Sequence, residues 1–573
     1  MQAKKLNVNW KIKEVADETE INFLAESLSI SQVLAKLLVF RNIKNFDQAK
    51  SFFRTSLDNL HDPFLMEDME KATTRVIEAL TNNERILIYG DYDVDGTCAT
   101  ALLYMFLKEL NADVDYYIPH RIKEGYGLTK VGVDYAKENN FHLIISVDCG
   151  VTARDEADYA KELGIDLIIC DHHKPKEILP AAFALLDPLK PNCNYPFKYL
   201  SGAGVAFKLA QGICKTIGKN DLLFQYLDLV ALAGAADIVP LIDENRTLVK
   251  AGLDLMNSSP RAGIKALIKS ARVELGNLSS GQIVFTLAPR INAVGRLSDA
   301  KIAVKLLISK DENESLELAK QLETENIERR KIDEGTLNKA IDLVETSRLF
   351  ECEAIILHEE DWHPGVIGIV ASRLVERYYK PTIMLTTIDG VAKGSARSIS
   401  NFNIYDALRE CQDLLLHFGG HEAAAGVAVE IKNLEEFKTK FNEVVKSRLL
   451  DKDKLYEIII DSKIRLTEID AKFIRIMDQF SPFGPGNLRP TFLAENVTAS
   501  SYRIVGNNHL LMLLRQEDSN KNFDAIGFDL GRFAKSLNGN KTTFDVVFSI
   551  DKMSREGKVF PQLRIKDIKI HPN

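Results

Sequence analysis

The sequence predicts a protein of the α/β class, with two α/β domains joined by a long helix and a small β-barrel of the OB type at the end of the chain. Short apolar runs alternate with helical segments between residues 76 and 240, which is typical of a parallel, doubly wound sheet. Residues 300–347 are rich in Lys and Glu at helical spacing, and short alternating segments with polar turns follow residue 455. A chain of 573 residues is too long for one hydrophobic core, so we expect roughly three to four domains.

The chain begins with a predicted helical lead-in at residues 1–75, whose amphipathic segments at 30–40 and 46–53 we expect to pack on the first domain. The segments that follow are an α/β domain at 76–300, a helical linker at 301–349, a second α/β domain at 350–450 and the β-rich module at 455–573. The linker contains helical stretches at 311–319 and 322–343. We interpret them as one charged helix between domains; a short coiled-coil contact is the alternative.

Composition narrows the functional classes only slightly. The net charge is -8 and the pI about 5.9, which gives no support for nucleic-acid binding but leaves room for local basic surfaces and bound metal ions. Seven cysteines without a CxxC pair indicate reduced thiols and argue against a disulfide framework or a structural zinc site. No run of about eighteen apolar residues occurs and the first residues lack an apolar signal core, so we expect a cytoplasmic protein without a membrane.

The predicted sheet of the first α/β domain carries a crowded acidic loop. We expect strands at 86–89, 114–118, 143–147, 167–170 and 184–186, and helices at 101–110, 130–137 and 153–163. Asp91, Asp93 and Asp95 come directly after the first strand, where the carboxyl end of a parallel strand binds ligands. Three carboxylates so close together repel one another unless a cation lies among them, which favours a divalent metal site over a solvated acidic turn.

Two further strands of this sheet end in groups that bind metals. Residue 147 leads into Asp148, residue 170 leads into Asp171-His172-His173, and a helical segment at 228–236 ends at Asp237. Groups at the ends of neighbouring parallel strands converge on one rim of a sheet, although a single Asp there is more often a helix cap. Oxygen and imidazole ligands without thiolates favour Mn²⁺ or Mg²⁺ over structural zinc.

Several glycine-rich stretches are candidates for anion binding. A loop is expected at 288–297, within an otherwise helical region, and it holds Arg290 and Arg296. The second α/β domain opens with a strand at 354–357 and a helix start that contains Gly365 and Gly368, where unpaired backbone N–H groups point outward. Loops at 393–398, with Ser395 and Arg397, and at 417–426, with His421, offer the groups that phosphate binding needs; singly, each is more often a turn.

The last segment is expected to be rich in strands. A Pro/Gly-rich stretch at 481–490 precedes predicted strands at 491–494, 510–514, 524–528 and 543–550, and the end of the chain is basic. Short strands of this kind indicate a small barrel, with OB barrels that handle single strands as one possibility. We expect its aromatic residues, including Phe523 and Phe528, to lie in the core.

Taken together, these motifs resemble the DHH phosphoesterase superfamily and, within it, the RecJ family of single-strand-specific 5′→3′ DNA exonucleases. The resemblance runs from about residue 80 to 430, and the β-rich tail is placed as in that family. The residues that carry it are Gly90-Asp-Tyr-Asp-Val-Asp-Gly96, Ser146-Val-Asp-Cys-Gly150, Cys170-Asp-His-His-Lys174, Ser201-Gly-Ala-Gly-Val205, Ala236-Asp-Ile-Val239, Trp362-His-Pro-Gly-Val-Ile-Gly368, Gly394-Ser-Ala-Arg-Ser398 and Phe418-Gly-Gly-His421. A minor departure is Cys98, where small or hydroxyl residues are more usual.

The resemblance implies a nuclease with two divalent metal ions, normally Mn²⁺ with Mg²⁺ as the alternative, in a cleft between a DHH domain and a DHH-associated (DHHA1) domain. The implied ligands are Asp91, Asp93, Asp148, His172 and Asp237. Asp95 is a possible further ligand, Asp171 would orient an imidazole, and His173 would hydrogen-bond the scissile phosphate. The groups implied to hold the 5′ end and the DNA phosphates are Arg121, Arg290, Arg296, Ser395, Arg397 and His421.

The activity implied is two-metal hydrolysis of single-stranded DNA to 5′-mononucleotides, in DNA repair and recombination, by a monomer that works with a helicase and a single-strand-binding protein. One alternative is another enzyme of the superfamily, either an oligoribonuclease or cyclic-dinucleotide phosphodiesterase or an inorganic pyrophosphatase. Those relatives typically lack the long helical link and the C-terminal β-module. A non-catalytic replication scaffold on the same fold is the alternative from another class, and this sequence keeps every metal ligand that such scaffolds lose.

Overall fold

The computed structural model describes residues 8–14, 17–121, 123–516, 521–537, 542–555 and 558–571. The first seven residues of the predicted lead-in therefore lie outside the described residues. The chain divides into two compact units. The smaller unit comprises Ala293–Asp299 and Lys320–Ile458 with the described residues up to Trp10, and the larger comprises Lys11–Asn292, Ala300–Ala319 and Ile459–Asn573. A short strand, β1 (Val8–Ile12), pairs with β12 (Tyr456–Ile460).

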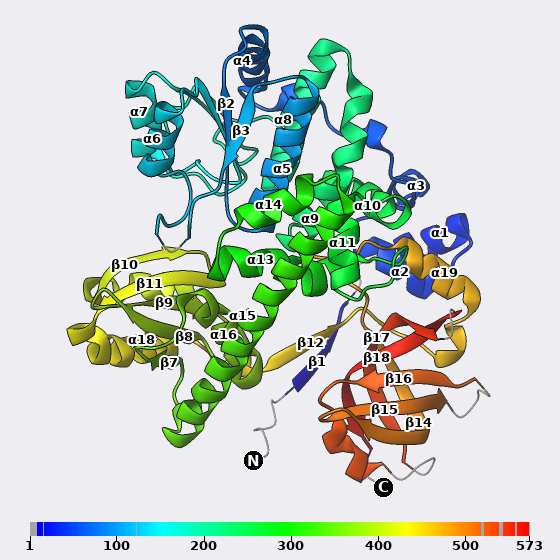
Figure 1. Cartoon of the computed structure of the whole chain (residues 1–573). Coiled ribbons are helices and arrows are strands. Elements are labelled where there is room, and N and C mark those ends of the chain that lie inside the picture. The colour runs from blue at the N-terminus through cyan, green and yellow to red at the C-terminus, as the bar shows by residue number, and fades with distance from the viewer. Residues whose placement is uncertain are drawn as a thin grey trace. The chain divides into compact units, whose positions relative to one another are not determined.

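The larger unit contains a parallel five-stranded sheet in the order β3-β2-β4-β5-β6. Helices cover both faces, with α6 and α7 on one side and α5 and α8 on the other (Figure 1), which confirms the expected doubly wound α/β domain. The elements are β2 (Ile86–Gly90), β3 (Val114–Tyr117), β4 (Leu143–Val147), β5 (Asp166–Cys170), β6 (Ala184–Leu186), α5 (Val94–Glu109), α6 (Lys130–Glu138), α7 (Arg154–Glu162) and α8 (Gly202–Ile217).

The register of this sheet brings three strand ends to one level. Gly90 pairs with Val147, and Val147 pairs with Cys170, so the last residues of β2, β4 and β5 lie side by side. Asp91, Asp148 and Asp171 are the next residues along each strand. The predicted convergence at one rim of the sheet is thereby confirmed.

Helices surround the rest of this domain. They are α4 (Met69–Thr81), α9 (Leu227–Ala236), α10 (Asp243–Ser258), α11 (Ala262–Ser270), α12 (Ser280–Gln282), α13 (Ala288–Leu297) and α14 (Lys301–Ile308). The prediction of a loop at 288–297 is wrong, because this stretch is α13, which follows a π-helical turn at Ile283–Leu287. Pro289 directly follows the π-helical turn, and the burial of Ile291 and Val294 favours the helix.

The smaller unit contains a mixed sheet in the order β10-β11-β9-β8-β7, packed between two groups of helices. The long helix α15 (Glu312–Thr346) is continuous for 35 residues, as expected for the linker, and its second half packs with α16 (Pro364–Tyr378) on one hydrophobic cluster. A separate cluster lies beneath α17 (Ile404–Arg409) and α18 (Leu434–Arg448). The strands are β7 (Ile355–His358), β8 (Thr382–Ile388), β9 (Val391–Arg397), β10 (Leu415–Gly420) and β11 (Ala424–Glu430).

Two glycine-rich stretches expected to be loops form strands of this sheet. Residues 393–397 belong to β9, and most of 417–426 belongs to β10 and β11, so both loop predictions are wrong. Antiparallel pairing of β9 with both β8 and β11 satisfies its backbone groups, and this outweighs the low strand propensity of glycine. A Cβ on Gly394 would lie 1.9 Å from the Met384 carbonyl oxygen, so the close approach of β8 requires glycine.

The C-terminal module is a closed barrel within the larger unit. Its sheet runs β13-β14-β15-β16-β18-β17 and closes because β14 also pairs with β17. The elements are β13 (Ser462–Lys463), β14 (Phe492–Val505), β15 (His509–Gln516), β16 (Phe523–Gly527), β17 (Phe544–Arg555), β18 (Lys558–Ile570) and α19 (Ala471–Gln479). The basic end of the chain is thus a full strand. Phe523 is buried as expected, whereas Phe528 is 45% exposed, because β16 ends at Gly527.

The lead-in contributes to the core of this barrel. The helices α1 (Glu18–Leu28), α2 (Gln32–Val39) and α3 (Phe46–Phe53) place Leu24, Leu37 and Ala49 in one hydrophobic cluster with barrel residues. The expected packing on the first α/β domain holds for the later part of the lead-in. Arg246 and Lys250 of α10 donate hydrogen bonds to the carbonyl groups of Phe52 (3.1 Å) and Phe53 (2.8 Å) in α3, and the 3₁₀ turns Leu57–Asn59 and Pro63–Leu65 contact α10 and α8. The earlier helices α1 and α2 pack on the barrel instead. Among the described residues no single helix suffices to cross a membrane, and α1 and α2 pass a test of length and composition only as a pair bent by 119°.

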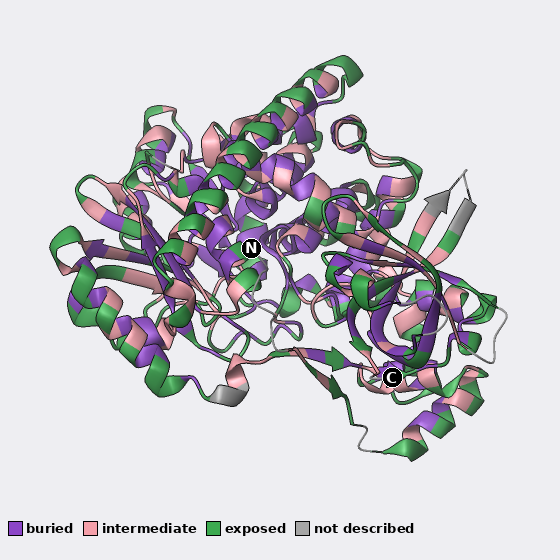
Figure 2. Cartoon of the chain, turned by 90° about the horizontal axis from the view of Figure 1, so that it is seen from below, coloured by how far each residue is buried: buried purple, intermediate pink, exposed green. Residues whose placement is uncertain are grey.

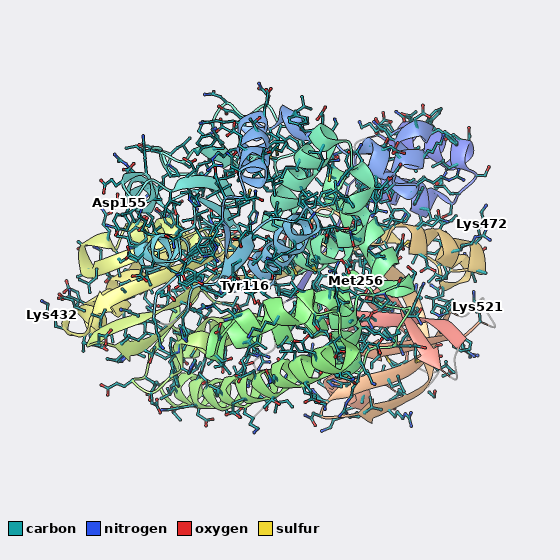
Figure 3. The ribbon with its side chains drawn as sticks, turned by 45° about the horizontal axis from the view of Figure 1, so that its top comes forward. Tyr116, Asp155, Met256, Lys432, Lys472 and Lys521 are labelled. Atoms are coloured by element: carbon teal, nitrogen blue, oxygen red, sulfur yellow. The ribbon has the colours of Figure 1, made fainter. Side chains whose placement is uncertain are left out.

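Burial follows these elements. Figure 2 shows buried residues concentrated in the sheets and on the inner sides of the helices, with exposed residues on the outer turns. In Figure 3, Lys432, Lys472 and Lys521 project outward from the ribbon, and all three are exposed. Met256 of α10 is fully buried. The cysteines Cys98, Cys149 and Cys170 are buried free thiols, as expected for small core residues.

Candidate metal centre

The acidic loop after β2 has one carboxylate turned to the core and one that starts a helix. Asp91 is buried, and Asp93 is the N-cap of α5, where its Oδ1 accepts a hydrogen bond of 3.1 Å from the Gly96 N–H. A Cβ on Gly96 would lie 2.6 Å from the Asp91 carbonyl oxygen, so glycine is required for the helix to begin this close to the strand end. The turn thus holds two carboxylates beside the sheet rim.

Asp95 lies near the other acidic groups and also stabilises the start of α8. Its carboxylate accepts hydrogen bonds from the N–H groups of Gly202 (2.6 Å) and Ala203 (2.8 Å), which belong to the first turn of α8. Such bonds satisfy donors that have no partner within a helix. Burial, and then the charge of Asp93, raises the pKa of Asp95 to about 7.

Asp148 lies at the end of β4 in a left-handed conformation, with φ +59°, and its side chain is buried. Its N–H donates to the Cys170 carbonyl, which carries the sheet pairing one residue past the strand. A Cβ on Gly202 would lie 2.6 Å from Asp148 Oδ1, so the start of α8 approaches this carboxylate as closely as a backbone can. Burial and the charges of Asp95 and Asp93 raise the pKa of Asp148 well above its ordinary value.

Asp171 orients the two histidines that follow it. Its Oδ1 accepts hydrogen bonds from the His172 N–H (2.7 Å), the His173 N–H (3.1 Å) and His173 Nδ1 (2.8 Å), and its Oδ2 accepts one from Val151 (2.9 Å). Burial alone would raise the pKa of Asp171, but the hydrogen bond and charge of His173 lower it to about 2. Burial would lower the pKa of His173, but the bond to Asp171 raises it to about 9.

His172, unlike His173, has a lowered pKa. Burial, and then the neighbouring His173, lowers the pKa of His172 to about 4, so its imidazole is neutral near pH 7. Its Nε2 lies 3.1 Å from Asp148 Oδ1, 3.7 Å from Asp95 Oδ2 and 3.7 Å from Asp237 Oδ2. Asp237 caps the C-terminal end of α9, and burial, with the charges of Asp95 and Asp93, raises its pKa to about 8.

These residues fit a divalent cation. Three buried atoms of the site residues have no hydrogen-bond partner among the described residues, namely Asp91 Oδ1, Asp148 Oδ1 and His172 Nε2. Unpaired buried acceptors are costly, and a cation is the partner that satisfies all of them together. Three sets of potential ligand atoms each lie within 4.8 Å of one another: Asp91, Asp93 and Asp148; Asp95, His172 and Asp237; and Asp148, His172 and His173. Oxygen and imidazole donors of this kind suit Mn²⁺ and Mg²⁺.

An aromatic group beside His173 was missed by the sequence interpretation. The Tyr126 hydroxyl lies 3.3 Å from His173 Nε2, and its ring makes an edge contact with Tyr92, whose centroid is 6.2 Å away. The Arg121 guanidinium lies 4.9 Å from the centre of the Tyr92 ring. The signal was present in Gly125-Tyr-Gly127, because both glycines have positive φ (+91° and +83°) and aim the residue between them.

Arg290, in the same unit, is buried, and its Nη1 donates a 2.5 Å hydrogen bond to the Thr286 carbonyl in the preceding turn. The Arg290 side chain therefore lies buried against the helical turn that precedes α13.

In the smaller unit, three of the predicted phosphate-binding residues lie beside the start of α16, namely Arg296, Ser395 and Arg397. His363 caps α16, with its Nδ1 accepting a 3.0 Å hydrogen bond from the Gly365 N–H, and Arg296 donates a 2.9 Å bond to the Gly365 carbonyl. A Cβ on Gly368 would lie 2.8 Å from Arg397 Nη2 and 3.1 Å from Ser395 Oγ. Arg397 and Ser395 thus lie against the first turns of a fifteen-residue helix, whose N–H groups favour anions.

His421 is exposed at the end of β10, and its N–H donates 2.8 Å to the Ala424 carbonyl. In this position its imidazole is accessible to solvent.

Comparison with known proteins finds three family matches along the chain. Residues 85–234 match the DHH family N-terminal domain, residues 350–447 the DHHA1 domain and residues 460–567 the RecJ OB domain. These matches confirm the predicted fold class.

Individual relatives agree with the family matches. The single-stranded-DNA-specific exonuclease RecJ of Bacillus subtilis (strain 168) is 40% identical over 565 residues, which cover 98% of this chain and 70% of that protein. The protein with the same name in Escherichia coli (strain K12) is 34% identical, over 81% of this chain and 84% of that protein. The structure of RecJ in complex with Mn²⁺ from Thermus thermophilus superposes with a TM-score of 0.84 at 28% identity, covering 99% of this chain and 80% of that one. A RecJ structure with Mg²⁺ from the same organism gives a TM-score of 0.77 at 26% identity, covering 99% and 79% of the two chains.

Proposed function

The chain belongs to the RecJ family within the DHH phosphoesterases and is a metal-dependent nuclease, and from this premise we propose that it degrades single-stranded DNA from the 5′ end and releases 5′-mononucleotides. One observation carries the proposal. The buried, unpaired atoms Asp91 Oδ1, Asp148 Oδ1 and His172 Nε2 come together at the ends of adjacent parallel strands, as ligands of a divalent cation would.

We assign metal binding to Asp91, Asp93, Asp148, His172 and Asp237, with Asp95 as a possible further ligand. Two divalent ions, preferably Mn²⁺ and alternatively Mg²⁺, would supply a water-derived nucleophile and offset charge on the phosphate oxygens. The chain's own part is to hold His172 neutral, so that its Nε2 lone pair faces the ions, and to hold the carboxylates in place through α8 and the sheet.

His173 has the complementary role. The Asp171 carboxylate accepts its Nδ1–H at 2.8 Å and keeps the imidazole protonated. The Nε2 atom faces the Tyr126 hydroxyl, which holds the imidazole ring in place while the Nε2–H is shared with a phosphate oxygen. A charged donor aimed at developing negative charge stabilises the transition state of phosphodiester hydrolysis.

Binding of the strand is assigned mainly to phosphate contacts. Ser395 and Arg397 beside the start of α16 would take a phosphate through charge-assisted and backbone hydrogen bonds. Arg121, Arg290, Arg296 and His421 are the further candidates for the 5′ end and its neighbouring phosphates. Contacts of this type carry little base specificity, which suits an exonuclease that must accept every sequence.

The closed C-terminal barrel offers a surface for bases. Phe528 is 45% exposed, with the His509 ring 5.0 Å and the Arg564 guanidinium 4.9 Å from its centre. Bases of a single strand stack on such aromatic and cationic groups. By its family resemblance we assign the protein to DNA repair and recombination in the cytoplasm, as a monomer that acts with a helicase and a single-strand-binding protein.

The test compares single-stranded DNA labelled at the 5′ or the 3′ end, with Mn²⁺, Mg²⁺ or EDTA. Labelled mononucleotide should appear at once from the 5′ label and only late from the 3′ label, and EDTA should abolish the release. Blunt duplex DNA, single-stranded RNA, a dinucleotide and pyrophosphate serve as competing substrates. Faster hydrolysis of the dinucleotide or of pyrophosphate than of DNA would favour the other enzymes of the superfamily.

A further inference from the structure

The segment that follows Asp237 has an unusual backbone. Ile238 has a φ of +60°, a left-handed conformation that β-branched residues rarely adopt. Its side chain is exposed, so its own burial does not hold it there. A strained backbone beside a functional residue persists where the surroundings fix it. The residues that follow Ile238 in the chain have such surroundings.

Those residues pack against a loop from the far end of the sequence, residues 480–488, which we term the brace. The Leu241 N–H donates a 2.7 Å hydrogen bond to the Pro485 carbonyl. A Cβ on Gly484 would lie 2.7 Å from Leu241 Cδ1, and a Cβ on Gly486 would lie 2.9 Å from Ile242 Cγ2. The brace thus touches two consecutive residues of the segment through its backbone.

The brace keeps its own shape through a buried asparagine. Asn487 Nδ2 donates hydrogen bonds of 2.7 Å to the carbonyl groups of both Phe480 and Pro482. The backbones of Gly484 and Asn487 exchange two further bonds, of 3.1 and 3.0 Å. The loop is therefore closed on itself.

Two arginines and a serine from other elements fix the brace in the larger unit. Arg246 of α10 donates to the carbonyl groups of Phe480 (2.9 Å) and Ser481 (3.0 Å). Arg41, which follows α2 of the lead-in, donates 2.6 Å to Asn487 Oδ1, and Ser280 of α12 donates 2.8 Å to the Phe483 carbonyl. Because three separate helical regions hold it, the brace is a rigid support for the segment after Asp237.

We propose that the brace is a positioning element that fixes residues 238–242 and so holds the Asp237 carboxylate 3.7 Å from His172 Nε2, setting the affinity for the divalent cation. This inference rests on the proposed function, because it treats Asp237 as a metal ligand. Gly484 and Asn487 are the positioning residues. They lie outside residues 85–234, which match the DHH family, so part of the metal affinity is encoded in the C-terminal third of the chain.

The main test is Gly484→Ala in the full-length protein, because the added methyl group must displace Leu241. The readout is Mn²⁺ binding, measured by calorimetry and by the electron paramagnetic resonance signal of free Mn²⁺. We expect the dissociation constant of at least one Mn²⁺ to rise about tenfold, as for other groups that support a ligand from outside the coordination shell. Removing the obstructing side chain in Gly484→Ala/Leu241→Ala should recover part of that affinity.

A matched control is Gly527→Ala, where a Cβ would lie 2.7 Å from Leu530 Cδ1, the same kind of clash in the barrel of the same unit. It should lose stability without losing Mn²⁺ affinity. Asn487→Asp is the second variant, for use if Gly484→Ala does not fold. It replaces the amide donor to Phe480 and Pro482 with an acceptor at nearly unchanged volume, and it should weaken Mn²⁺ binding in the same way.

The outcomes separate the two proposals. If wild type binds Mn²⁺ and both folded brace variants bind it equally well, the brace proposal is overturned and the proposed function stands. An equal loss of affinity in Gly527→Ala would also overturn it, since the effect would then be general destabilisation. A wild-type protein without affinity for Mn²⁺ would overturn the proposed function, and the brace proposal with it.

Discussion

Nε2 of His172 and Oδ1 of Asp148 lie 3.1 Å apart, and neither atom has a hydrogen-bond partner among the described residues. The imidazole is neutral near pH 7, because burial, and then His173, lowers its pKa to about 4. A neutral imidazole has one unprotonated nitrogen, and with Nε2 in that state its lone pair faces a buried oxygen whose own carboxyl has a raised pKa. This pair is poorly satisfied without a cation.

Asp148→Asn should abolish nuclease activity and yet stabilise the protein in EDTA. The substitution removes a buried carboxylate that other acidic groups repel, and it lets an amide N–H donate to His172 Nε2. The hydrogen bond gained should add about 1 kcal/mol to the free energy of unfolding, the usual net value of one hydrogen bond. Thermal unfolding in EDTA and in Mn²⁺ measures this. Mn²⁺ should raise the unfolding temperature of wild type only; a variant that is less stable than wild type in EDTA would contradict the assignment.

The stability of the protein in EDTA should depend on pH through Asp95 and Asp237, whose pKa values are raised to about 7 and about 8. A carboxyl with a raised pKa in the folded state contributes stability that is fully present below its unfolded pKa, near 4, and is lost as the pH rises through the folded value. The free energy of unfolding should therefore fall between about pH 4 and 8. Asp237→Asn should flatten this decline when urea unfolding is followed across that range, and an unchanged slope would argue against the raised pKa.

Arg397→Ala should weaken the binding of single-stranded DNA while leaving Mn²⁺ affinity unchanged, because Arg397 lies in the smaller unit beside the start of α16. Loss of one phosphate contact should lower the slope of log affinity against log salt by about one. Lys432→Ala is the matched control, since Lys432 is an exposed cation of the same unit paired with Glu430. Equal losses in both variants would mean that general charge, and not this site, binds the strand.

Tyr126→Phe should lower kcat about two- to twelvefold with little change in KM, which corresponds to the net value of one hydrogen bond, about 0.5–1.5 kcal/mol. The hydroxyl lies 3.3 Å from His173 Nε2, whereas the ring keeps its edge contact with Tyr92 in the variant. Single-turnover rates on 5′-labelled DNA measure the effect. A rise in KM at constant kcat would instead assign the hydroxyl to strand binding.

The convergence of acidic residues at one edge of the first sheet was predictable, because each of these residues directly follows its strand in the sequence. Asp91, Asp148 and Asp171 each follow an apolar strand directly, and parallel pairing then sets them at one level. Asp237 follows a helix, so its place near His172 could not be derived from strand order and came from the family motif alone. Tyr126 was missed because two positive-φ glycines determine its direction, and hydrophobic periodicity carries no information about such turns.

Other errors arose where long-range packing or pairing outweighs local composition. Residues 288–297 contain Pro, Asn and Gly, yet the burial of Ile291 and Val294 makes them a helix. The glycines at 394 and 420 lie in strands because neighbouring strands pair with both. Phe528, which was expected in the core, is exposed because β16 ends at Gly527, one residue before the end of the predicted strand 524–528. None of these outcomes can be read from a window of neighbouring residues.

The two hydrogen bonds that Asp95 accepts from the first turn of α8 affect the interpretation of a mutational scan of this chain. Substitutions at Asp95 and at Asp148 would give the same inactive phenotype, for different reasons. Loss of Asp95 removes the acceptor for the N–H groups of Gly202 and Ala203, so the variant should be depleted in the cell. Loss of Asp148 should leave abundance at or above that of wild type. A scan that measures protein abundance as well as growth would thus distinguish Asp95, which stabilises the fold around the site, from Asp148, which is assigned to metal binding.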